Sequence, residues 1–239
     1  HLRDVVKKAW NPNHPVDDSK ELMSYRAAAL GILLGLAYIL AWLGRAGLPL
    51  HVAALFVGGI ILAYLGITRL VVQAGVYYVT TPILSQAMTG ATLGTAAATA
   101  PGLTAMGLCF SFFGDVQSIF MPAAAHAAKL HDRLGVGRGL GLAIALAVVV
   151  GFYASLSYIV YMAYEQGAAN FNSWFYRASS GAGVRAFDII ASTIKNTSGP
   201  HWEKLGFFGI GATAMSVLTF LQYRFPWWPV HPIGLSIAS

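Results

Sequence analysis

Long apolar runs, separated by short polar or glycine- and proline-containing segments, dominate the chain. Six of them are long enough to cross the hydrocarbon core of a bilayer as helices. They cover residues 27–43, 50–67, 70–89, 91–113, 140–164 and 205–223. The pattern therefore predicts an all-α protein, a polytopic transmembrane helix bundle of about six spans.

Two of the runs contain residues that a lipid-facing helix rarely carries. Pro82 lies within the third run, and Pro101 with Gly102 lies in the middle of the fourth. Because proline removes a backbone donor and clashes with the preceding turn, we expect kinked or broken helices at both prolines. The many small residues of the fourth run favour a position buried between other helices.

The remaining segments have interfacial character. A short helix is predicted from Met121–Pro122 onward, since proline suits a first helical turn. Two short helices, interfacial or partly re-entrant, are predicted between residues 165 and 204. Residues 1–25 are predicted to be a cytoplasmic N-terminal segment, followed by a transmembrane helical domain over 26–239. We expect the chain to be a fragment of a longer protein, because it begins without Met and a new apolar segment opens after Pro232.

Composition supports a membrane protein. Of the 239 residues 56% are hydrophobic and 10% are charged, which is more apolar surface than a soluble domain can bury. The formal charge of +6 is spread between the apolar runs without clustered stacking aromatics. This distribution favours membrane lipids as partners and argues against nucleic acid. The single Cys109 excludes an intrachain disulfide within this sequence.

The basic residues also predict an orientation. If all six runs cross and the N-terminal segment is cytoplasmic, ten Lys and Arg residues lie on the cytoplasmic side and five on the other. This bias is typical of the positive-inside rule. We therefore expect a multi-pass protein of the cell inner membrane, with Arg69 and Arg224 on the cytoplasmic side and Arg45 opposite.

The stretch from Thr68 to His131 places polar groups within or beside apolar runs. Such groups are costly in lipid and need partners from protein or water, so they are candidates for a binding site. The predicted substrate-binding residues are Gln73, Thr80, Thr81, Gln86, Thr104 and Asp115. Asp115 has two open interpretations, a carboxylate that binds a cation or proton and a helix N-cap at the membrane surface. Arg69 either pairs with Asp115 or extends to the interface.

The sequence does not predict an enzyme. Ser192–Lys195 fits S-x-x-K and Gly209–Ala214 fits G-x-G-x-x-A. The companion motifs of the first are missing, and the second lies in a predicted span with no preceding strand. His126 and His131 are five residues apart, which does not stack them on one helix face as a spacing of four would. We therefore expect no catalytic residues, no metal site and no cofactor.

Several segments resemble one family. They are Asp17–Ser19, Ser24–Arg26, Tyr64–Arg69, Gly114–Asp115, Phe120–Ala123 and Trp227–Gly234. Over nearly the whole chain they look like a group of long bacterial polytopic membrane proteins known only as domains of unknown function. That group is remotely similar to oligopeptide transporters, secondary transporters with many spans and broken helices. The resemblance implies a middle-to-late portion of a longer membrane protein and supplies no ligand residues.

Two functions remain open after these observations. The first is part of a secondary transporter-like core that moves a small solute or peptide, in which broken helices offer free backbone groups. The alternative is a non-catalytic structural subunit of a larger membrane complex. In that case other membrane subunits, or missing parts of the same chain, satisfy the polar groups. A water-accessible cavity at mid-depth would favour the first function.

Overall fold

The computed structural model describes residues 2–11, 15, 24–75, 84–109, 120–134, 139–167, 170, 182–225 and 227. Every regular element within these residues is helical, which confirms the all-α prediction. The elements are α1 (Leu2–Trp10), α2 (Tyr25–Arg45), α3 (Leu50–Ala74), α4 (Ser85–Leu93), the 3-10 turn η1 (Thr95–Ala97), α5 (Ala100–Leu108), α7 (Phe120–Leu134), α8 (Leu140–Gln166), α9 (Ala182–Lys195) and α10 (Trp202–Arg224).

Four of the helices in the described part of the chain are long and apolar enough to cross a membrane. They are α2, α3, α8 and α10, and they match four of the six predicted runs. The chain is therefore a multi-pass membrane protein. α3 is longer than predicted because it continues through Leu70 to Ala74. It ends at Gly75, whose φ of 68° lies in the left-handed region that glycine adopts without strain.

The runs at 70–89 and 91–113 were predicted as spans, but their described residues do not form one long helix each. The first five residues of the third run belong to α3, and α4 and α5 have only nine residues each. Nine residues measure about 13 Å, less than half of a hydrocarbon core of about 30 Å. Pro101 does not kink a long helix but lies in the first turn of α5, where its missing amide costs no helical hydrogen bond. Pro82 lies outside the described residues.

The shorter predicted helices are found in part. α7 begins at Phe120, one residue before the predicted start. α9 is one of the two helices predicted between residues 165 and 204. Residues 171–180, where the other was expected, lie outside the described part.

The chain divides into two compact units, each made of segments that are distant in sequence. The first comprises residues 1–42 and 126–181 and contains α1, most of α2, most of α7, and α8. The second comprises residues 43–125 and 182–239 and contains α3, α4, α5, α9 and α10. All buried apolar side chains among the described residues belong to the second unit, so the core lies there.

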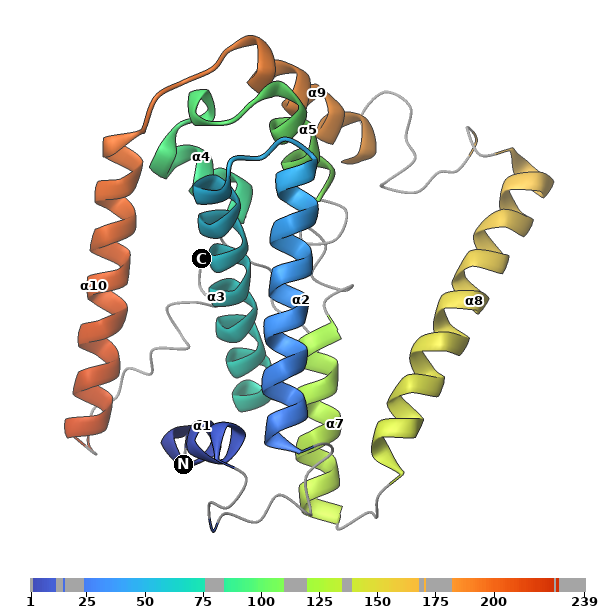
Figure 1. The fold of residues 1–239 in the computed structure, drawn as a ribbon, viewed down its shortest axis with the longest axis vertical. Helices are drawn as coiled ribbons and strands as arrows, with labels where there is room; N and C mark the ends of the chain where they lie inside the picture. The colour runs from blue at the N-terminus through green and yellow to red at the C-terminus, as the bar shows by residue number, and fades with distance from the viewer. Residues whose placement is uncertain are drawn as a thin grey trace. The chain divides into compact units, whose positions relative to one another are not determined.

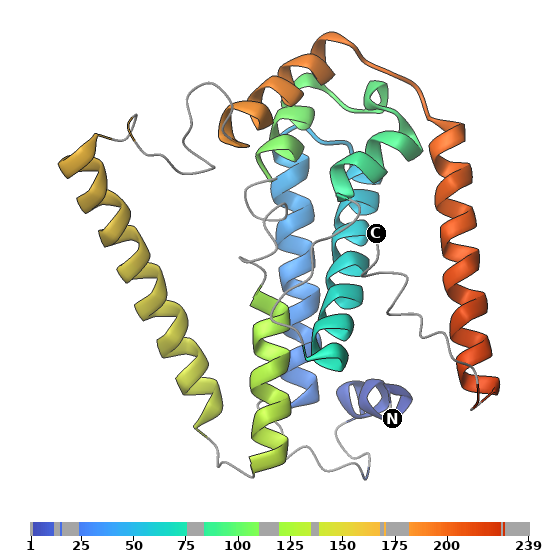
Figure 2. The same ribbon diagram turned by 180° about the vertical axis from the view of Figure 1, so that it is seen from behind.

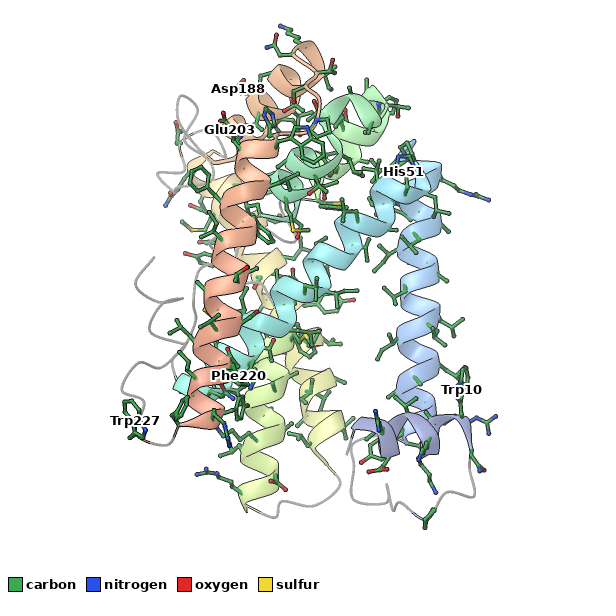
Figure 3. All side chains as sticks on the ribbon, turned by 90° about the vertical axis from the view of Figure 1, so that its left-hand side faces the viewer. Trp10, His51, Asp188, Glu203, Phe220 and Trp227 are labelled. Carbon is green, nitrogen blue, oxygen red and sulfur yellow. The ribbon has the colours of Figure 1, made fainter. Side chains whose placement is uncertain are left out.

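Within the second unit α4 packs against the first part of α3, and α9 packs against α5 (Figures 1 and 2). α10 runs in the same direction as α3. Near its start His201 N donates to Ala91 O at 2.9 Å, and near its end Tyr223 accepts a hydrogen bond from Arg69 of α3. We call the two ends of this unit the His51 end and the Arg69 end. Figure 3 shows His51, Asp188 and Glu203 at the first, and Phe220 and Trp227 toward the second.

Candidate functional site

Residues 85–109 form a hairpin of two short helices, α4 and α5, which we call the half-helix hairpin. Its first helix begins against the interior of α3. A Cβ atom on Gly59 would lie 2.5 Å from Met88 Cε and 3.4 Å from Ser85 Oγ, so the small glycine lets α4 approach α3 with Met88 in its present position. Since Gly59 is the tenth residue of α3, α4 starts about 13 Å from the first residue of that helix. α4 therefore begins within the apolar length of a span.

The hairpin turns at the His51 end. Thr99 Oγ1 donates to Gly47 O in the loop between α2 and α3, and it accepts a hydrogen bond from Gly102 N at 3.2 Å. A Cβ atom on Gly102 would lie 2.7 Å from Gly47 O, so the close approach requires glycine. α5 therefore starts on this loop, and its last turn comes back to Gln86 at the start of α4.

The linker between α9 and α10 closes the turn of the hairpin. Ser198 N donates to Thr95 Oγ1 at 2.8 Å, and Ala96 N donates to Ser198 O at 3.2 Å. Gly94 has a φ of 77° and lies against Ser198 and Gly199 with no room for a side chain. These bonds satisfy backbone groups that would each cost several kcal/mol if they faced lipid, roughly the gain from burying a leucine.

The inner ends of the two short helices meet at Gln86. This residue lies in the first turn of α4, and its Nε2 donates to Met106 O in the last turn of α5 at 3.5 Å. Its Oε1 is buried and has no hydrogen-bond partner among the described residues. The N-cap residue Leu84 supplies no side-chain cap to the first amides of α4. A helix N-terminus and a helix C-terminus thus lie within reach of one glutamine side chain.

This arrangement is electrostatically polarised. The start of α4 carries a partial positive charge and the end of α5 a partial negative charge. Away from bulk water such partial charges act more strongly, because the local dielectric constant is lower. The pair of ends can hold an anionic group on one side and a cationic or hydrogen-bond donor group on the other. Gln86 Oε1 adds an acceptor at the same place.

A second buried oxygen without a partner lies farther along α3. Thr68 Oγ1 is buried and unpaired within the described residues. Thr68 is nine residues beyond Gly59, about 13 Å closer to the Arg69 end. Threonines in helices often donate to the carbonyl four residues earlier, as Thr89 and Thr92 do in α4. Buried acceptors therefore occur at two levels along α3.

The six predicted binding residues are placed differently from one another. Gln86 is half-buried and reaches a helix end. Thr104 Oγ1 donates to Ala100 O within α5 at 3.0 Å, so its hydroxyl is used inside its own helix. Gln73 is exposed in the last turn of α3, near the Arg69 end and away from Gln86. The three other residues, Thr80, Thr81 and Asp115, lie outside the described part of the chain.

Sequence reasoning did not include Thr68 or the Met106 carbonyl among the binding residues. Thr68 stands between Ile67 and Arg69 in a long apolar run, where its polarity was the available signal. Met106 acts through its backbone, so no side-chain pattern could have indicated it. For Arg69 the structure provides Tyr223 Oη as a hydrogen-bond acceptor at 3.2 Å.

Metal-ligating side chains do not gather in the described part of the chain. No group of three or more His, Cys, Asp or Glu residues there could hold a metal ion. The candidate site in these residues is therefore built from helix ends and neutral polar side chains.

Comparison with known proteins gives a family without a known function. The model of the Family of unknown function (DUF6785) matches residues 1–239, and the chain therefore belongs to that family. No curated protein and no solved structure matches the chain significantly. The family match agrees with the resemblance to an uncharacterised family found in the sequence.

Proposed function

We propose that this member of DUF6785 forms part of a secondary transporter-like core in a bacterial inner membrane, with its solute site at the inner ends of the half-helix hairpin. The observation that carries the proposal is the meeting of α4 and α5 at Gln86, whose Oε1 is left without a partner among the described residues. Secondary transporters bind solutes and coupling ions at the ends of discontinuous helices. The remote resemblance to oligopeptide transporters adds support.

The polarity of the two ends favours a small zwitterionic solute such as a short peptide. Its carboxylate would lie at the start of α4, and its ammonium group near Met106 O and Gln86 Oε1. A partly buried helix end contributes up to about 2 kcal/mol to the binding of a complementary charge. Two ends together supply about 4 kcal/mol, which corresponds to a Kd of about 1 mM. Such weak binding suits a site that must release its solute.

The course of the chain is consistent with the six crossings proposed for this core. Gly75 lies at the end of α3, at the Arg69 end of the second unit, and Thr99 lies against Gly47 at the His51 end. The chain therefore passes the length of α3 between these two residues, although no single helix among the described residues does so. With the N-terminal segment cytoplasmic, the crossing by α3 keeps Arg69 and Arg45 on opposite sides.

Accessibility of position 86 to water tests the proposal without knowledge of the solute. The native cysteines of the full-length protein, Cys109 among them, are replaced by alanine, and Gln86→Cys is introduced. In sealed vesicles a charged, membrane-impermeant methanethiosulfonate reagent should modify this cysteine from at least one side. A mixture of di- and tripeptides should slow the modification if the solute is a peptide.

A matched control separates an aqueous site from mere exposure. Leu62 is 70% exposed on α3, only three residues beyond Gly59, so Leu62→Cys samples a similar depth on an exposed apolar surface that we expect lipid to cover. It should stay unmodified because a thiol in lipid does not ionise. Arg45→Cys, at the end of α2, should react and shows that the reagent works. If the cysteine at position 86 is unreactive from both sides while the one at 45 reacts, the transporter proposal is wrong.

The alternative, a non-catalytic structural subunit, draws on a different observation. None of the described residues of α8 or α10 is buried, and α10 carries a shallow, open furrow. The furrow is lined by Gly206, Gly209, Ile210, Thr213, Ala214, Val217 and Leu218. Small residues of this kind allow another helix to approach closely. If the chain is such a subunit, we expect the cysteine at position 86 to be unreactive and other membrane proteins to co-purify with the chain.

A further inference from the structure

At the Arg69 end, an exposed hydrogen bond links two spans, α3 and α10. Arg69 Nη2 of α3 donates to Tyr223 Oη of α10 at 3.2 Å. The Tyr223 side chain is 77% exposed, and Arg69 is exposed as well. The contact therefore lies on the surface of the unit, open to a third group.

Within the part of the chain that the structure describes, the donors at this place are only partly used. A guanidinium has five N–H donors, and the hydrogen bond to Tyr223 occupies one of them. Tyr223 accepts in that bond, so its own hydroxyl proton is available for another acceptor. Arg224 adds a second cation at the next position of α10. In the described part of the second unit the acidic residues are Asp188 and Glu203, and both lie at the opposite end (Figure 3).

Aromatic side chains place this cluster at the depth of lipid headgroups. Tyr223 and Arg224 are the last two residues of α10, and Phe225 and Trp227 follow with their ring centroids 5.9 Å apart. Trp227 is 73% exposed. Tryptophan and tyrosine prefer the membrane interface, where their apolar rings contact acyl chains and their polar groups contact headgroups.

We propose that Arg69, Tyr223 and Arg224 bind the phosphodiester group of an anionic phospholipid. The planar fork of a guanidinium pairs with two phosphate oxygens at once, and the Tyr223 hydroxyl donates to a further oxygen. The two cations favour an anionic over a zwitterionic headgroup. The exposed rings of Phe220 and Trp227 beside the cluster favour a lipid over free phosphate, because they offer an apolar surface to the acyl chains.

Native mass spectrometry of the full-length protein with added phosphatidylglycerol tests this site. Each cation near an anionic lipid surface contributes about 1 kcal/mol, so Arg69→Gln and Arg224→Gln should each weaken lipid binding about five-fold. The double variant should lose the tightly bound lipid. Tyr223→Phe keeps the ring and removes the hydroxyl, so it should weaken binding about two-fold, and it carries the test if the arginine variants do not fold.

The control is Arg45→Gln, an exposed arginine at the end of α2 that has no part in this cluster. It should bind phosphatidylglycerol as the unchanged protein does, and phosphatidylcholine or inorganic phosphate should not displace the bound lipid. An equal loss in Arg45→Gln, or no loss in the Arg69→Gln, Arg224→Gln double variant, would overturn the proposal. Displacement by inorganic phosphate would show a general anion site and would also overturn it.

Discussion

α3 and α8 are equally apolar, yet the fold uses them differently. They have 25 and 27 residues and the same mean hydropathy. Val52, Phe56 and Ile60 of α3 are at most 6% exposed, whereas none of the described residues of α8 is buried. Hydropathy therefore decides whether a helix can enter a bilayer, but it does not decide what covers the helix there.

The close approach of a neighbouring helix accounts for the difference in burial between α3 and α8. Gly59 of α3 lies against Met88 and Ser85 of α4, whereas Gly151 of α8 has nothing within 4 Å of an added Cβ atom. In lipid, apolar contact between helices gains little from the hydrophobic effect, because acyl chains are as apolar as leucine. Packing and hydrogen bonds must then hold neighbours together. α3 gains packing from α4, and the loop before it accepts a hydrogen bond from Thr99 at Gly47 O. The following substitutions test whether that distinction is real.

The largest effect is expected at the turn of the hairpin. In Gly102→Ala the added Cβ atom would lie 2.7 Å from Gly47 O and 3.0 Å from Leu48 Cα. Neither backbone atom can rotate away as a side chain could, so we expect a loss of about 3 kcal/mol of stability. The matched change Gly151→Ala in α8 should stay within about 0.5 kcal/mol. Thermal unfolding in detergent measures both, and equal melting temperatures would contradict the close approach.

A smaller effect is expected when a large side chain is truncated. Ile60→Ala should leave a cavity on the buried face of α3 and cost about 2 kcal/mol, mainly the packing term, since lipid and protein interior are similarly apolar. Leu146, 56% exposed on α8, should lose less than about 0.5 kcal/mol on the same change because lipid fills the space. The comparison is best made in the same lipid nanodiscs. A large loss in Leu146→Ala would show that another protein segment covers α8.

The smallest of the three effects concerns a hydroxyl. Thr99→Val removes the cap of Gly102 N and the donor to Gly47 O, so we expect a loss of about 1 kcal/mol. Thr213→Val in α10 removes a hydroxyl that donates to Gly209 O within its own helix, at 2.8 Å, and should cost less. Chemical denaturation of the two variants side by side measures the difference. Equal losses would mean that Thr99 does not hold the hairpin to the loop at Gly47.

Part of the candidate site was predictable from single residues. Pro101 marked the fourth run as unable to form an ordinary helix, and Gln86 marked the third as carrying a polar group into an apolar segment. The use of each residue was not predictable. Pro101 starts a helix instead of breaking one, and Gln86 bonds to a carbonyl twenty residues away. Proline is compatible with both a kink and a first turn, and the choice depends on where the chain reverses.

The sequence by itself determined that the chain is helical and crosses a membrane. The length and hydropathy of an apolar run are local properties, and they decide whether the run can enter lipid as a helix. It left two roles open for Arg69, a pair with Asp115 or an extension to the interface. Only the tertiary structure decided that α4 and α5 form a hairpin held by Gly47, Thr99 and Ser198. Those contacts join a threonine hydroxyl to a backbone group far away in the sequence, and backbone groups carry no side-chain pattern from which the partner could be predicted.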